Sequence, residues 1–320
     1  MSEVRKQTGP PRALLMGAFA AVYISWGSTF LAIRYAIETL PPFLMAAARF
    51  LIAGAILFCT ARLIGAEAPK PKQWGPSAIA GALLLLIGNG GVVLAEQHVP
   101  SGIAALAIAT EPLWIGVLDW LRPGGKRPST NVSLGLAVGF LGALVLIGPS
   151  NALGAGGAVS PIAAVLLMFA SFSWALGSIY SRSAKLPSSP LLSAGMQMLC
   201  GGVLLLIGSL VTREWTGLDI HTISFRSIVA LSYLIVFGAL VGYTCYGWII
   251  KVSTPALAST YAYVNPVVAV ILGWLVGGEA IAIRTVVAAG IIVLAVVLIT
   301  TDHRRPVAQP EGESAAVASR

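Results

Sequence analysis

The chain has 320 residues, of which 57% are hydrophobic and only 10% are charged. Soluble domains carry about 25% charged residues, so this composition indicates a membrane protein and excludes the soluble classes. The formal net charge is +8. The basic residues lie between long apolar runs, where they report membrane topology, and we expect no nucleic-acid partner.

The apolar runs, taken in chain order, predict ten transmembrane helices. Runs of about 20 residues are long enough to cross roughly 30 Å of hydrocarbon as helices. The first run lacks a convincing small-residue cleavage site, so we expect it to be retained as a span. The predicted spans are 13–36, 42–64, 75–98, 101–122, 131–149, 158–182, 190–212, 226–251, 254–277 and 281–301.

The basic residues predict the orientation of these spans. With the N-terminus inside, four of the 20 Lys and Arg residues fall in outer segments or at span edges, and Arg49 lies within a span. The other 15 are inner: Arg5, Lys6, Arg12, Arg62, Lys70, Lys72, Arg122, Lys126, Arg127, Arg182, Lys185, Lys251, Arg304, Arg305 and Arg320. The positive-inside rule therefore places both terminal tails, 1–12 and 302–320, in the cytoplasm.

The second half of the sequence repeats the first. A stretch rich in small residues leads into Glu111-Pro112 and again into Asn265-Pro266, and 265 − 111 gives a spacing of 154 residues. Five spans per half is an odd number, so the two halves would enter the membrane in opposite directions and form an inverted repeat. Such a duplication is typical of transporters that bind substrate between their halves.

The predicted fold is therefore an all-α polytopic membrane protein with both termini inside. Its ten helices form two inverted five-helix repeats, 13–149 and 158–301. The connection, 149–159, is uncharged and rich in glycine, which suits a flexible link between the halves.

Glu111-Pro112 is the first candidate for function. A carboxylate near the middle of a span is expensive and usually faces the protein interior or water. Pro112 lacks an amide hydrogen, so the carbonyl of Ile108 loses its helical partner. Asn265-Pro266 repeats this arrangement. Both pairs fit a substrate or gating locus, and both also fit a helix kink with an internally hydrogen-bonded polar residue.

Other polar residues within the spans leave two interpretations open. Arg49, inside the second span, is either a structural link between helices or a contact for an anionic substrate group. Asn89 is either a polar lining residue or a helix-to-helix hydrogen bond. Glu96, Arg34 and Asp119 lie nearer span ends, where we expect structural or interfacial roles.

Aromatic residues form a third group of candidates. Trp26 and Trp174 occupy matching positions in the two halves, and Thr29, Tyr243 and Tyr261 are nearby candidate lining residues. Trp and Tyr offer flat apolar faces with one hydrogen-bonding tip, which suits an aromatic or amphipathic solute. The same residue types also form interfacial belts. Because the two tryptophans lie well inside their spans, we expect them to line a cavity.

The sequence shows no pattern for an enzyme, a metal or a cofactor. The three histidines lie at span ends or outside spans, and the three cysteines lie singly inside spans. No Ser-His pair at membrane depth and no phosphate-binding loop occurs. We therefore expect a protein that catalyses no reaction.

Several motifs resemble those of the EamA family in the drug/metabolite transporter superfamily. They are W-G-S-T-F-L-A-I-R (26–34), P-P-F-L-M-A-A-A-R-F-L-I-A-G (41–54), I-G-N-G-G-V-V-L-A-E (87–96), V-P-S-G-I-A-A-L (99–106), S-Y-L-I-V-F-G-A (232–239), S-T-P-A-L-A-S-T-Y-A-Y-V-N-P-V-V-A-V-I-L-G (253–273) and G-G-E-A (277–280). The resemblance implies two inverted five-helix repeats around a central cavity lined mainly by helices 1, 3, 4, 6, 8 and 9. It also implies the bacterial inner membrane as the location.

The family's Glu-Pro motif falls on Glu111-Pro112, whereas Asn265-Pro266 stands where many members keep a second Glu-Pro. The first span also lacks the membrane-embedded glutamate that small four-helix relatives use for proton coupling. The expected function is secondary-active export of small organic metabolites, such as amino acids, or of amphipathic drugs by alternating access. A passive channel or facilitator is the alternative, and a membrane scaffold or receptor is a third. The expected partners are a small-molecule substrate and the lipid bilayer, and the sequence does not distinguish a monomer from a homodimer.

Overall fold

The computed structural model describes residues 11–121, 129–147, 160–252, 261–281 and 283–302. Within these ranges the backbone forms helices, turns and coil, and no strand. The helices at the predicted spans are α1 (Arg12–Ala36), α2 (Pro42–Leu63), α3 (Pro71–Gly81) with η1 (Ala82–Asn89) and α4 (Gly90–Ala95), α5 (Ser101–Ile108), α6 (Glu111–Leu121), α7 (Thr130–Ile147), α8 (Pro161–Ser183), α9 (Pro190–Val211), α10 (Phe225–Tyr233) with η5 (Leu234–Val241) and α11 (Gly242–Val252), α13 (Tyr261–Leu275) and α14 (Ile283–Asp302). Two short 3₁₀ turns, η3 (Glu214–Gly217) and η4 (Ile220–Thr222), follow α9.

Length and composition make this a multi-pass membrane protein. In the described part of the chain, seven helices are long and apolar enough to cross a membrane. These are Arg12–Ala36, Pro42–Leu63, Pro71–Ala95, Ser101–Leu118, Pro161–Ser183, Pro190–Val211 and Phe225–Ile249, and the shorter apolar helices are Val264–Leu275 and Ile283–Ala295. An all-helical polytopic fold is thus confirmed, while the number of ten spans and their orientation stay predictions.

Proline marks the start of several helices. Pro42, Pro71, Pro161 and Pro190 are the first residues of α2, α3, α8 and α9. Proline suits this position because the first amide groups of a helix have no intrahelical acceptor, so its missing N–H costs nothing there. The sequence therefore fixes where these helices begin.

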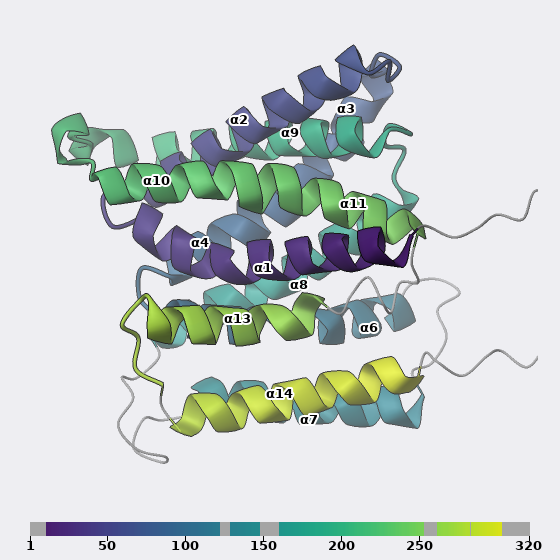
Figure 1. Ribbon diagram of the computed structural model, residues 1–320, viewed down its shortest axis with the longest axis vertical. Coiled ribbons are helices and arrows are strands. Elements are labelled where there is room, and N and C mark those ends of the chain that lie inside the picture. The colour runs from purple at the N-terminus through teal and green to yellow at the C-terminus, as the bar shows by residue number, and fades with distance from the viewer. Residues whose placement is uncertain (1–10, 122–128, 148–159, 253–260, 282, 303–320) are drawn as a thin grey trace, which may run out of the picture.

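The axes of most helices lie roughly parallel to one another, and α2 is inclined to them (Figure 1). α2 packs on α9, and α7 packs on α14 at the opposite side of the molecule. Glycines allow the first of these contacts: a Cβ added to Gly54 would lie 2.9 Å from the amide nitrogen of Leu199, and one on Gly195 would lie 2.8 Å from that of Phe58. Small residues bring helices close where lipid leaves no hydrophobic driving force between them.

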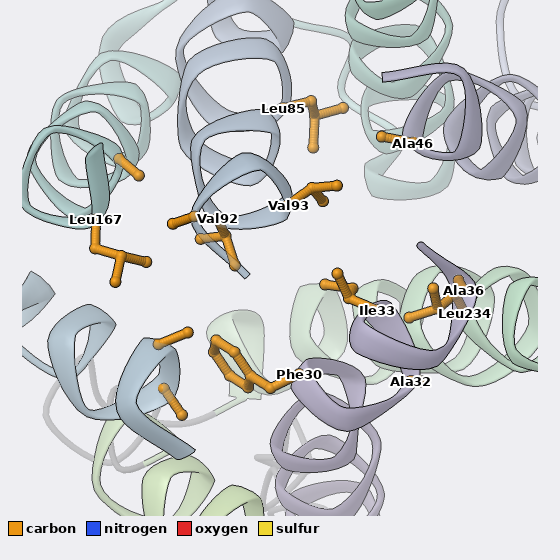
Figure 2. Packing of buried hydrophobic residues seen from close by; sticks show 14 of the residues in the cluster. Phe30, Ala32, Ile33, Ala36, Ala46, Leu85, Val92, Val93, Leu167 and Leu234 are labelled. Atoms are coloured by element: carbon orange, nitrogen blue, oxygen red, sulfur yellow. The ribbon is translucent and has the colours of Figure 1, made fainter. Parts of the chain in front are cut away.

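A large apolar core joins helices from both halves. Phe30 and Ile33 of α1, Val93 of α4 and Leu167 of α8 belong to one buried cluster. Figure 2 shows these side chains projecting into the space between their helices. The core therefore joins α1, α4 and α8 in one buried cluster. It also positions the polar residues on the adjacent turns of these helices.

Two segments of π-helix occupy corresponding places in the two halves. η1 and η5 have eight residues each, and each interrupts a longer α-helix. α8 packs on η1, and α1 packs on η5. π-helical segments are rare and occur frequently at functional sites. The apolar periodicity of these spans did not predict them.

The two proline motifs differ in the backbone. The sequence predicts a kink at Pro112, but the helix is interrupted, because residues 109–110 separate α5 from α6. The hydroxyl of Thr110 donates to the carbonyl of Ala107 at 2.7 Å, and Pro112 is the second residue of α6, a position where an amide hydrogen has no acceptor within its own helix. Pro266, in contrast, lies inside α13.

Candidate substrate pathway

An aromatic cluster brings three helices together. We define it as Trp26 of α1, Tyr243 and Tyr246 of α11, and Tyr261 of α13. The ring centroid of Trp26 lies 5.5, 4.9 and 5.0 Å from those of Tyr243, Tyr246 and Tyr261, respectively. Its indole N–H donates to the carbonyl of Gly238 at 3.1 Å. Aromatic pairs of this kind contribute about 0.5–1.5 kcal/mol beyond their buried area, so the cluster holds α1, α11 and α13 in register.

Glu111 lies beside this cluster, at the first residue of α6. Its side chain is buried, with 4% of its surface exposed. The hydroxyl of Tyr261 donates toward both carboxylate oxygens, at 3.2 and 3.4 Å. Asn265 lies one turn further along α13, on the face that carries Tyr261. It is also buried, and its side-chain oxygen accepts no hydrogen bond from the described residues.

Thr29 and Arg49 continue the polar path from the other side of Trp26. The Thr29 hydroxyl donates to the carbonyl of Trp26 at 2.6 Å. A Cβ on Gly238 would lie 2.8 Å from Thr29 Cγ2 and 2.9 Å from Arg49 Nη2, so the bare backbone of η5 leaves room for both side chains. Arg49 is 3% exposed, and its guanidinium lies 4.8 Å from the Phe50 ring centroid.

Trp174 and Asn89 lie at a second place, where α8 packs on η1. A Cβ on Gly88 would lie 3.1 Å from Trp174 Cε3. Asn89 is the last residue of η1, and its side-chain oxygen has no hydrogen-bond partner in the described ranges. The two tryptophans therefore match in sequence and differ in surroundings. The predicted residues that gather around the aromatic cluster are Trp26, Thr29, Arg49, Glu111, Tyr243, Tyr261 and Asn265.

A second polar cluster closes the end of the bundle where α1 and α13 finish. We call it the Glu279 cluster: Arg34, Ser101, Gly102 and Glu279. The Glu279 carboxylate accepts hydrogen bonds from the Ser101 amide (2.9 Å), the Ser101 hydroxyl (2.7 Å) and the Gly102 amide (3.2 Å), and it forms an ion pair with Arg34. Gly278 makes this possible, because its φ of +64° turns the chain back toward α5.

The charge of Glu279 is stabilised by this arrangement. Burial alone would raise the pKa of the carboxyl group, but the hydrogen bonds from Ser101, Arg34 and Gly102 outweigh it and hold the pKa below its ordinary value. Sequence reasoning did not single out Glu279. The glycine pair before it, a common signal for a helix C-terminus, and the uncapped start of α5 at Ser101 were the available clues.

Glu96 is expected in a structural or interfacial role, and its surroundings do not fit the interfacial one. An interfacial position would leave its carboxylate in contact with water or headgroups. In the structure only 5% of its surface is exposed, and neither oxygen has a hydrogen-bond partner among the described residues. It interacts electrostatically with Arg49, Arg34 and Glu279. Arg34 has the expected structural role, and the side chain of Asp119 lies outside the described residues.

Comparison with known proteins places this geometry in a family. Residues 13–148 and 161–301 each match the EamA-like transporter family. The chain belongs to this family. The family predicted from the motifs is therefore confirmed, and EamA membership identifies a membrane transporter, which implies a small-molecule substrate.

Two relatives extend over nearly the whole EamA chain. The uncharacterized inner membrane transporter YedA of Escherichia coli K12 is 41% identical over 288 residues, covering 89% of this chain and 90% of YedA. The uncharacterized transporter YvbV of Bacillus subtilis 168 is 25% identical over 300 residues, covering 93% of this chain and 95% of YvbV. A solved crystal structure matches with a TM-score of 0.64 at 20% identity and covers 92% of this chain and 99% of that one; at this identity it shows a shared fold.

Proposed function

We propose that this EamA protein is a secondary-active transporter that exports small organic metabolites, amino acids or related solutes among them, or amphipathic drugs. One observation carries the proposal: the buried carboxylate of Glu111 lies against the aromatic cluster, where α1, α6, α11 and α13 converge. Ionisable residues at membrane depth usually mark a substrate or ion pathway.

We further propose ten transmembrane helices in two inverted repeats, 13–149 and 158–301, with both termini in the cytoplasm. The excess of basic residues in the predicted inner segments supports this orientation. The two family matches, one per half, and the corresponding π-helical segments support the duplication. The name of the relative YedA supports a place in the bacterial inner membrane.

Alternating access would then move helices that are already interrupted. α5 and α6 are separate helices, and η1 and η5 loosen the regular hydrogen bonding of their spans. Rocking of one repeat against the other would open the region around Glu111 to each side in turn. No reaction, cofactor or metal enters this mechanism, and the described residues contain no group of three or more metal-binding side chains.

A carrier fits the closed interior better than a channel does. Glu111, Trp26 and Tyr261 are 4%, 8% and 8% exposed, and Trp26 of α1 and Glu111 of α6 both contact Tyr261 of α13. An open pore would keep such groups in contact with water. A passive facilitator stays the alternative, and kinetic measurements separate the two.

The proposed locus is tested by substitution once a solute is in hand. A thermal-shift screen of the purified protein against metabolites identifies such a solute, because a ligand that binds only the folded state raises the stability of the protein. In proteoliposomes, Glu111→Gln and Asn265→Ala should each lower transport at least about 10-fold. This factor corresponds to the loss of one hydrogen bond to the solute, worth roughly 1.4 kcal/mol. Glu67→Gln, in an exposed loop, is the matched control. Unchanged rates in both stably inserted variants would show that the locus is wrong.

A further inference from the structure

The guanidinium of Arg49 is a buried cation with unused donors. Nε and Nη1 are inaccessible and donate to no hydrogen-bond acceptor among the described residues, and the whole side chain is 3% exposed. A charge within a membrane span usually pairs with another residue or faces a water-filled cavity. A charged donor that is buried without a hydrogen-bond acceptor costs several kcal/mol. This arrangement therefore calls for an acceptor that the described part of the chain does not supply.

Glu96, the carboxylic acid that interacts with Arg49, does not fill this role. Glu96 interacts electrostatically with Arg49, but its two carboxylate oxygens also lack hydrogen-bond partners, and no ion pair within 4.0 Å joins the two residues. A direct link between α2 and α4 would have satisfied both groups. Instead, Nε and Nη1 of Arg49 and both oxygens of Glu96 have no hydrogen-bond partner among the described residues.

The position of Arg49 connects it to the proposed pathway. Its Nη2 lies against Gly238, whose carbonyl accepts the indole N–H of Trp26. Thr29 contacts the same glycine. A continuous set of contacts therefore runs from Arg49 through Gly238, Trp26 and Tyr261 to Glu111.

We propose that Arg49 binds a carboxylate group of the transported solute, an inference that rests on the transport function proposed above. The planar guanidinium presents paired donors whose geometry matches a carboxylate. A monoanion fits better than a phosphate dianion, because a single guanidinium supplies one positive charge and Arg34 is already paired with Glu279.

The test measures binding by thermal stabilisation of the purified protein, with matched acid and amide probes: hexanoate and hexanamide, 3-phenylpropionate and 3-phenylpropionamide, L-leucine and L-leucinamide. At least one acid should stabilise the wild type more than its amide does. Arg49→Met should weaken binding of that acid about 10- to 100-fold, as expected for hydrogen bonds to a charged group. Arg49→Lys keeps the charge without the planar guanidinium, so it should bind the acid more weakly than the wild type and more tightly than Arg49→Met.

Glu96→Gln separates a binding role from an internal link. If Arg49 binds the solute, the Glu96→Gln variant should keep the preference for the acid over its amide. Loss of acid binding in Glu96→Gln would show that the two residues act as an internal pair and would overturn the proposal. Equal stabilisation by acids and amides, unchanged acid binding in Arg49→Met and Arg49→Lys, or no stabilisation by any probe would overturn it too. Transport of an uncharged solute that survives Arg49→Met would leave the export function standing and remove only the carboxylate assignment.

Discussion

Replacing Glu279 by glutamine should destabilise the protein, because one carboxylate joins three parts of the bundle. It receives three hydrogen bonds from the start of α5 and an ion pair from Arg34 at the end of α1. Glutamine keeps one acceptor oxygen and places an amide NH₂ against donors. Arg34 is also left without its counter-charge.

The expected loss follows from these contacts. A hydrogen bond to a charged group contributes about 1.5–3 kcal/mol. In Glu279→Gln every contact of this side chain loses its charged acceptor, and at least one hydrogen bond loses its geometry. Because the Arg34 side chain is 37% exposed, solvent screens its share, and we expect a total of about 2–4 kcal/mol. That corresponds to a fall in Tm of about 3–6 °C for a chain of this length.

Thermal unfolding in detergent measures this fall, with Glu38→Gln as the control. Glu38 pairs with Arg226 at 3.4 Å through side chains that are 39% and 54% exposed, so its loss should change stability by less than about 0.5 kcal/mol. The pKa of Glu279 lies below its ordinary value, so its contribution is present at neutral pH and is lost as pH falls through the folded-state pKa. The difference between wild type and Glu279→Gln should therefore hold from pH 8 to pH 5 and shrink only in stronger acid. Equal Tm values for wild type and Glu279→Gln at pH 7 would refute this reasoning.

Two further substitutions test the aromatic cluster. Gly242→Ala places a methyl group where Trp26 Nε1 lies, so it should displace the indole, lower Tm and reduce transport. Gly17→Ala is the control: no neighbouring atom lies within 4 Å of the added carbon, so Tm and transport should stay unchanged. Equal effects of the two substitutions would contradict the packing described. Tyr261→Phe removes the hydroxyl that donates to Glu111 and should cost about 1–3 kcal/mol in thermal unfolding. In a double-mutant cycle that cost should shrink in the Glu111→Gln background, and strict additivity would show that the two groups do not interact.

Much of the fold could be predicted from the sequence, because hydrophobic runs and prolines act locally. Run length identified the helices, and Pro42 or Pro190 marks a helix start for reasons contained in one residue. The family followed from motifs in both halves. The interruption at Thr110 and the π-helical segments were not predicted, since they depend on how neighbouring helices replace lost backbone hydrogen bonds.

The candidate site was predicted by residue type and not by arrangement. Glu111 and Asn265 stand out as polar residues in apolar spans, yet the hydrogen bond from Tyr261 to Glu111 depends on where α13 lies relative to α6. Trp26 and Trp174 match in sequence, but only Trp26 joins the aromatic cluster. Glu96 shows the limit most clearly: a position near a span end favours exposure, and burial follows from the packing of α4 against its neighbours.

Counterflow in proteoliposomes tests the central claim, that this protein is a carrier, most directly. Vesicles are loaded with a high concentration of a solute found by thermal shift, and uptake of a trace of labelled solute is followed with and without a pH gradient. A carrier should accumulate label transiently above its equilibrium level, and Glu111→Gln should abolish that overshoot. Label that rises only to equilibrium, at the same rate whether or not unlabelled solute is inside, would contradict the account and indicate a passive channel.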